Sequence, residues 1–171
     1  NEIPMVMHAP APEYSWEENS TNRKELGVMG TSLSWVDYYN ELVEVLEKYP
    51  KLKITFAHMM FLSDNIDKLT EIFETYPNVS IDLALGGFMK DVSNNIEIWR
   101  EFFTKYSHRI LFGTDNYNNF ITNDDCFELI VRNEPIRKLL EYKEPFTARV
   151  YGAKAVFNPL LIVSKKYFLL F

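Results

Sequence analysis

The chain has 171 residues, of which 47% are hydrophobic and 15% aromatic, which suits one domain with a sizeable core and excludes a disordered protein. The formal net charge of −6 argues against a surface for nucleic acid or for anionic membranes. The single cysteine excludes an intrachain disulfide, and no apolar run reaches the roughly 18 residues of a membrane span. No signal peptide precedes the first apolar run. We therefore expect a cytoplasmic protein.

Short apolar runs alternate with longer amphipathic ones along the chain. The apolar runs predict strands at residues 3–7, 53–57, 78–85 and 109–115. Apolar residues at helical spacing predict helices at residues 34–48, at 63–75 with Ser63 or Asp64 as N-cap, at 94–106, at about 124–142 and at 146–157. This order suits parallel strands joined by covering helices, and the continuous apolar runs suit a sheet that is buried on both faces.

A polar residue stands at or just beyond the carboxyl end of each predicted strand. These residues are His8, His58, Asp82 and Asp115. Active sites of parallel barrels lie at that end, so the pattern favours an α/β protein of the (β/α)8 TIM-barrel type over an open, doubly wound sheet. No glycine-rich phosphate loop follows any strand, and therefore nothing indicates a nucleotide site.

Two histidines and an aspartate at three strand ends make a candidate metal site. Imidazole and carboxylate are common ligands of zinc and related divalent ions, and a metal would supply the positive charge that a buried Asp115 needs. The alternative is that His8 and His58 are partly buried histidines with partners inside the fold, and that Asp115 caps a turn. Spacing alone leaves both interpretations open.

Three further residues are weaker candidates for a pocket that holds a small-molecule substrate. Tyr14 and Trp16 belong to the long loop after the first strand, where they could cover a substrate or simply pack. Asp82 could line the pocket or accept hydrogen bonds from a neighbouring loop. His108 precedes its strand, which places it at the opposite end of the sheet.

Four short motifs occur in a fixed order over about residues 4–157. They are "VMHAP" followed by a tryptophan, "AH" after the second strand, "FGTD" after the fourth, and "VYGAKAVF" with Ala153 where an asparagine is common. This series resembles strands 5, 6 and 8 and the helix after the barrel in the amidohydrolase superfamily. The branch that it resembles most is the amidohydrolase-2 group, which includes relatives of aminocarboxymuconate semialdehyde decarboxylase.

The resemblance implies a distorted TIM barrel with a divalent metal, zinc or manganese, at the strand ends. It implies that His8 is a metal ligand, that Asp115 binds the metal or takes a proton from the metal-bound water, and that His58 polarises the substrate. The activity that it implies is hydrolysis of an amide, ester or lactone bond. The same branch also carries out non-oxidative decarboxylation, which is the alternative.

One departure from the family pattern limits this expectation. The His-x-His pair of the first strand is absent, since the only histidines are His8, His58 and His108. We therefore expect residues 1–157 to form the last four β/α units of a barrel, followed by an apolar tail at 158–171 whose role the pattern leaves open. Such a half-barrel would be a fragment, would associate with a missing N-terminal half, or would be a non-catalytic module that self-associates.

Overall fold

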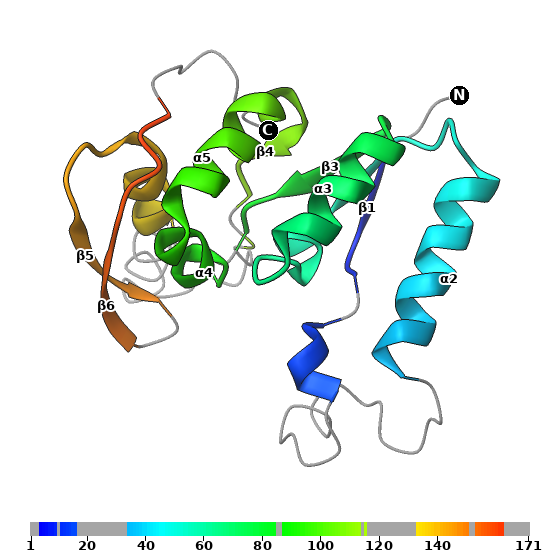
Figure 1. Ribbon diagram of the computed structural model, residues 1–171, viewed down its shortest axis with the longest axis horizontal. Coiled ribbons are helices and arrows are strands. Elements are labelled where there is room, and N and C mark those ends of the chain that lie inside the picture. Colours follow the sequence, from blue (N-terminus) through cyan, green and yellow to red (C-terminus); the bar gives the residue numbers. More distant parts are fainter. Residues whose placement is uncertain are drawn as a thin grey trace, which may run out of the picture.

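A four-stranded parallel sheet is the centre of the fold (Figure 1). The computed structural model describes residues 4–9, 11–16, 34–84, 87–113, 115, 133–150 and 153–162. The strands are β1 (Met5–Met7), β2 (Ile54–Phe56), β3 (Val79–Asp82) and β4 (Ile110–Leu111), hydrogen-bonded in that order. The prediction of a parallel α/β sheet is confirmed, and no closure into a barrel is seen among the described residues.

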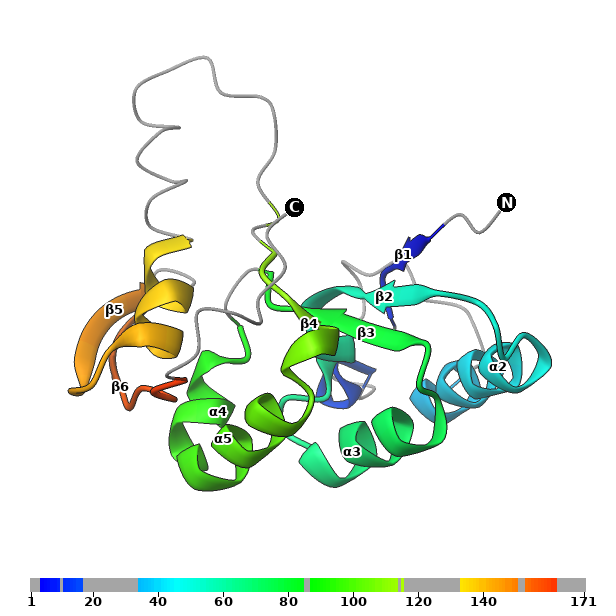
Figure 2. The ribbon, with the colours of Figure 1, turned by 90° about the horizontal axis from the view of Figure 1, so that it is seen from above.

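Helices connect the strands and lie on one side of the sheet, as Figure 2 shows for α3 and α5. They are α2 (Trp35–Lys48), α3 (Ile66–Thr75), α4 (Met89–Asn94) and α5 (Ile96–Lys105), with short 3-10 turns η1 (Glu13–Trp16), η2 (Ala57–Phe61) and η3 (Ser107–Arg109). Residues 133–141 are also helical, within the range predicted at about 124–142. No helix in the described ranges is long and apolar enough to cross a membrane.

The helix α3 begins later than the sequence predicts. The side chain of Asn65 accepts a hydrogen bond from the N–H of Lys68 at 3.1 Å and so caps the helix. The prediction of Ser63 or Asp64 as N-cap is wrong, because the hydroxyl of Ser63 instead donates to the carboxylate of Asp91 at 2.6 Å. Ser63 and Asp64 therefore lie in the loop between β2 and α3.

The sheet is buried on one face and half-open on the other. Alternate side chains of the two central strands are fully buried in the hydrophobic core, namely Ile54, Phe56, Val79 and Ile81. Thr55 and Ser80, which are neighbours across the sheet and point to the opposite face, are only half-buried. The next residue in the same row, Val6 of the edge strand, is 73% exposed. The expectation of a sheet buried on both faces is therefore wrong for the described part of the chain.

The predicted helix at 146–157 is a β-hairpin. Its strands β5 (Phe146–Val150) and β6 (Ala153–Phe157) pair antiparallel, with Phe146 opposite Phe157. Burial in β5 alternates, since Phe146, Ala148 and Val150 are more buried than the residues between them. An apolar period of two is typical of a strand with one covered face, and this pattern prevails over helix propensity here.

The beginning of the apolar tail is part of the core. Asn158 donates its N–H to the hydroxyl of Ser93 at 2.6 Å, and Arg100 donates its Nε–H to the carbonyl of Leu160 at 2.6 Å. The N–H of Leu160 donates to the carbonyl of Leu139 at 2.7 Å, and the Leu160 side chain has no exposed surface. Residues 158–162 thus join α4, α5 and the helical residues 133–141, while 163–171 lie outside the described residues.

Candidate active site

Polar residues gather at the carboxyl edge of the parallel sheet. His8 directly follows β1, His58 lies in η2 directly after β2, and Asp82 is the last residue of β3. Asp115, which follows β4, is half-buried and has a positive φ of 48°. Since all four strands run in the same direction, the loops that carry these side chains leave the sheet on the same side.

The two strand-end histidines contact each other. The ring centroids of His8 and His58 are 4.9 Å apart, with the planes at 73°. The ring of Phe61 lies against both, with its centroid 5.0 Å from that of His8 and 5.1 Å from that of His58. The sequence pattern therefore identified two residues that the fold does bring together, and Phe61 is the third member of this group of rings.

Hydrogen bonding determines which nitrogen of His8 can bind a ligand. The Nδ1 atom lies 2.9 Å from the carbonyl oxygen of Ala9. A carbonyl oxygen can only accept, so Nδ1 carries the proton, and Nε2 of the neutral ring carries the free lone pair. A histidine that binds a metal through one ring nitrogen usually donates the N–H of the other nitrogen to a carbonyl or carboxylate. The bond from Nδ1 to Ala9 therefore suits His8 to bind a metal through Nε2.

The backbone at His58 is strained. His58, Met59, Met60 and Phe61 all have positive φ values, of 56°, 54°, 58° and 53°. Each residue with a side chain costs on the order of 1 kcal/mol in this left-handed region. The turn directs the His58 ring toward His8, and leaves the buried Nδ1 of His58 without a hydrogen-bond partner in the described structure. A buried polar atom of this kind is uncommon, and strained backbone of this kind clusters at functional sites.

Asp82 holds the strained turn in place. Its Oδ1 atom accepts the N–H of His58 at 2.9 Å and the N–H of Ala84 at 3.0 Å. Gly113, just after β4, lies so close that an added Cβ would be 3.0 Å from Cγ of Asp82. The Asp82 carboxylate therefore links the ends of β2 and β3 and lies close to the residue just after β4. The hydrogen bonds match the predicted alternative in which Asp82 bonds a neighbouring loop.

The two aromatic candidates in the loop after β1 differ in position. Tyr14 is 59% exposed and lines a pocket of about 630 Å³ together with His58. Trp16 donates its Nε1–H to the carbonyl of Ala11 at 3.1 Å and packs against Tyr38, with ring centroids 4.9 Å apart. Trp16 is not among the residues that line this pocket.

The described residues do not bring the predicted metal ligands together as a complete set. No group of three or more His, Cys, Asp or Glu side chains within these ranges is arranged to hold a metal ion. His8 and His58 fit a divalent metal by their donor chemistry and their proximity, but Asp115 does not join them as a third ligand. A complete set would need ligands from beyond the described residues.

The pocket contains polar residues that sequence reasoning did not assign to a site. Ser63 and Asp64 follow the turn that carries His58, and Asp91 lies in the first turn of α4. The one feature of the sequence that indicates a site here is the position of Ser63 and Asp64, a few residues after a strand end. This feature is ambiguous, because serine and aspartate before an amphipathic run also indicate a helix N-cap.

Comparisons of the chain with family models, with curated proteins and with solved structures gave no match.

Proposed function

We propose that this chain forms the C-terminal half of a metal-dependent hydrolase of the amidohydrolase-2 type, acting on an amide, ester or lactone bond. The observation that carries the proposal is the contact of His8 with His58, with ring centroids 4.9 Å apart, at the carboxyl ends of adjacent parallel strands. The resemblance of the motifs around these residues supports it. Active sites of parallel barrels occupy this edge.

In this proposal each strand-end residue has a separate role. His8 would hold a divalent ion, zinc or manganese, through Nε2, because its Nδ1–H is engaged by Ala9. His58 would polarise the substrate carbonyl, and Asp115 would bind the metal or accept a proton from water. The metal, when bound, supplies a Lewis acid that lowers the pKa of water toward neutrality. The remaining ligands would come from an N-terminal half-barrel or from another chain.

Metal uptake tests the proposal directly. The purified chain is incubated with excess zinc or manganese, freed of unbound ion and measured by elemental analysis. We expect the wild-type chain to retain less than one metal ion per chain, because part of the ligand set is missing, and His8→Ala and Asp115→Asn to retain still less. Asparagine is chosen at position 115 because it tolerates a positive φ. His108→Ala is the matched control, because His108 is exposed and lies before β4 at the opposite end of the sheet.

Two results would contradict the proposal. One is a wild-type chain that takes up no metal, and the other is equal uptake in the wild type and in His8→Ala. If the chain does bind metal, ester, lactone and carboxylate substrates are the compounds to test, and release of carbon dioxide instead of a new acid would indicate decarboxylation.

A non-catalytic module that pairs with a second copy of itself is the rival function. It is favoured by the edge strand β1, in which Met5, Val6 and Met7 are 38%, 73% and 37% exposed. An exposed apolar edge strand is a template for pairing with another chain. We expect light scattering to give a dimer mass for the wild type and a monomer mass for Val6→Lys if this rival is correct, whereas a wild-type monomer would exclude it.

A further inference from the structure

A pocket of about 630 Å³ lies beside His58 at the carboxyl edge of the sheet. Its walls come from the loops that follow β1, β2 and β3 and from the first turn of α4. The side chains that determine its chemistry are Tyr14, His58, Phe61, Asp64, Phe88 and Asp91. The volume falls in the range of about 300–1,000 Å³ that is typical of small-molecule sites.

The described charged side chains that line this pocket are carboxylates. Asp64 and Asp91 both line it, and none of the described residues around it is a lysine or arginine. The Asp91 carboxylate is held in position because its Oδ2 accepts the Ser63 hydroxyl at 2.6 Å. A smaller hollow of about 90 Å³ shares Phe61 and Asp64 and adds the carboxylate of Glu13. Among the described residues, a ligand in this region therefore meets carboxylates and no lysine or arginine.

The other walls are aromatic. Phe88 is buried, Tyr14 is exposed at the pocket, and Phe61 is fixed by its ring contacts with His8 and His58. Aromatic faces attract cations through the ring quadrupole and also bury the apolar body of a ligand. Carboxylates combined with aromatic faces therefore favour a ligand that carries a positive charge on an apolar body.

We propose that this pocket binds a small organic amine in its protonated form, with the ammonium group near the carboxylates of Asp64 and Asp91 and the apolar body against Phe61 and Phe88. His58 lines this pocket and also belongs to the candidate active site. The bound amine would therefore be part of the hydrolase substrate, and only this part of the inference rests on the proposed function. Binding itself requires neither metal nor turnover.

The test uses benzylammonium as the probe, with benzyl alcohol as its neutral counterpart and benzoate as its anionic one. Each is titrated into the full chain at low ionic strength without added metal, and binding is followed by calorimetry or by NMR shifts. We expect benzylammonium to bind at least about tenfold more tightly than benzyl alcohol, since one charge-assisted contact is worth about one factor of ten. Benzoate should bind most weakly.

Variants assign the effect to the pocket. In Asp64→Asn/Asp91→Asn the preference for benzylammonium over benzyl alcohol should disappear, while the amide of residue 91 can still accept from Ser63. Asp67→Asn is the control, because Asp67 is an exposed carboxylate in the first turn of α3 that does not line the pocket. Circular dichroism confirms that each variant is folded.

The outcomes separate this inference from the proposed function. Equal affinities for the charged and neutral probes, or an equal loss of preference in Asp67→Asn, would overturn the inference even if His8-dependent metal uptake is found. Charge-selective binding in a chain that takes up no metal would sustain the pocket and contradict the hydrolase.

Discussion

The carboxylate of Asp82 accepts the backbone N–H of His58 at 2.9 Å, and this bond fixes the start of the left-handed turn at the end of β2. The same oxygen also accepts the N–H of Ala84 at 3.0 Å. Four successive residues with positive φ persist only when the surrounding structure compensates for their conformational cost. A half-buried carboxylate with two N–H donors provides part of that compensation, so Asp82 positions the candidate site without belonging to the group of rings.

Replacing Asp82 should therefore destabilise the chain and release the turn. In Asp82→Ala two N–H groups lose their acceptor, and we expect the free energy of unfolding to fall by about 2–3 kcal/mol. Asp82→Asn keeps an acceptor oxygen and should lose less. Urea unfolding gives both values, and an NMR contact between the rings of His8 and His58 reports on the turn. An Asp82→Ala chain with unchanged stability would show that the turn does not depend on this carboxylate.

Replacing Gly113 with alanine, which adds only a Cβ atom, should already destabilise the chain. A Cβ at this position would stand 3.0 Å from Cγ and 3.1 Å from Cβ of Asp82, and 3.3 Å from Cβ of Ala84. Gly113→Ala therefore requires these atoms to move, and we expect a loss of about 1–3 kcal/mol in the free energy of unfolding. The double variant Asp82→Ala/Gly113→Ala should lose less than the sum of the two single variants, because truncation of Asp82 removes one clash. Additive losses would refute this coupling.

The strand-end histidines could be predicted, but the turn between them could not. His8 and His58 end apolar runs, and parallel strands carry their carboxyl ends to one edge, so their proximity follows from the sequence pattern. A left-handed run of His, Met, Met and Phe contradicts the local preference of each residue, and only tertiary contacts such as the bond to Asp82 select it. The position of Asp115 relative to the histidines likewise depends on a loop conformation that no periodicity encodes.

The C-terminal hairpin was missed for a different reason. The segment at 146–157 contains alanines and basic residues that favour a helix, and its similarity to a family helix reinforced that prediction. Its alternating burial, and the packing of Phe146 against Phe157 with ring centroids 5.8 Å apart, favour strands instead. When a short segment has both helix-favouring residues and an apolar period of two, the surface that it packs against determines its secondary structure.

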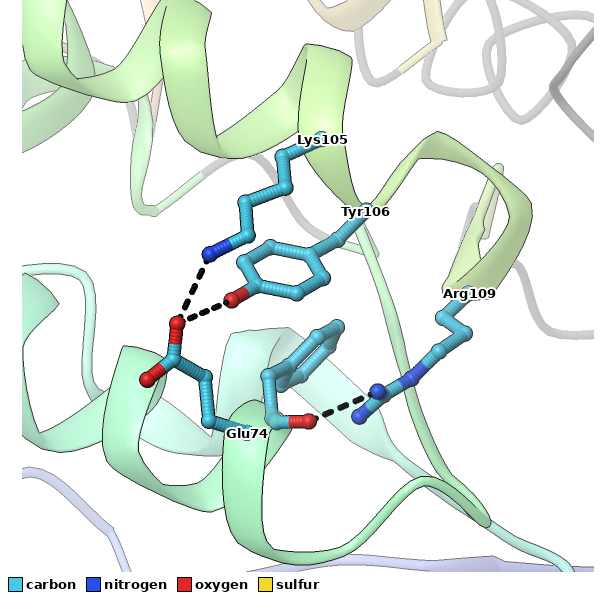
Figure 3. Close-up of polar contacts among 5 residues, drawn as sticks. Glu74, Lys105, Tyr106 and Arg109 are labelled. Atoms are coloured by element: carbon cyan, nitrogen blue, oxygen red, sulfur yellow. Dashed lines mark hydrogen bonds and ion pairs between the residues drawn. The ribbon is translucent and has the colours of Figure 1, made fainter.

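Arg109 should contribute more to stability than a charged side chain on the surface. Its guanidinium is buried and donates to the carbonyls of Val79, Phe73 and Tyr76 at 2.7, 2.8 and 3.0 Å, and it lies 4.0 Å from the centre of the Phe73 ring. Figure 3 labels Arg109 and draws one of these hydrogen bonds. Two of these carbonyls belong to the last turn and C-cap of α3, where helix carbonyls lack partners within the helix. Burial lowers the pKa of Arg109, and the nearby Tyr106 opposes that shift.

We expect Arg109→Met to reduce the free energy of unfolding by about 3 kcal/mol, because the carbonyls of Val79, Phe73 and Tyr76 each lose a charged donor. Arg109→Lys should recover only part of this, since a single ammonium cannot reproduce the planar fork. Arg137→Met is the control, because Arg137 makes an exposed i,i+4 ion pair with Glu141 worth less than about 1 kcal/mol. Equal losses in Arg109→Met and Arg137→Met would contradict the role assigned to Arg109.

Glu74 should make stability depend on pH at the contact between α3 and α5. Its Oε1 atom accepts Lys105 Nζ at 2.7 Å and the hydroxyl of Tyr106 at 3.1 Å, and these hydrogen bonds, that of Lys105 first, hold the pKa of Glu74 below its ordinary 4.5 (Figure 3). A lowered pKa in the folded chain means that the unfolded chain binds the proton more readily. The stabilisation is therefore complete above pH 4.5 and is lost as the pH falls through the lowered pKa of the folded state.

Thermal unfolding of the wild type and of Glu74→Gln across this range measures the effect. The glutamine keeps an acceptor oxygen but no charge, so the wild type should melt at the higher temperature at neutral pH, by a small margin because the pair is exposed. The two curves should converge as the pH falls through the lowered pKa of Glu74 in the folded chain, where the wild-type carboxyl takes up its proton. Glu71→Gln on the same helix controls for the general loss of one negative charge. A constant difference between the wild type and Glu74→Gln at every pH would show that the charge of Glu74 does not contribute to stability.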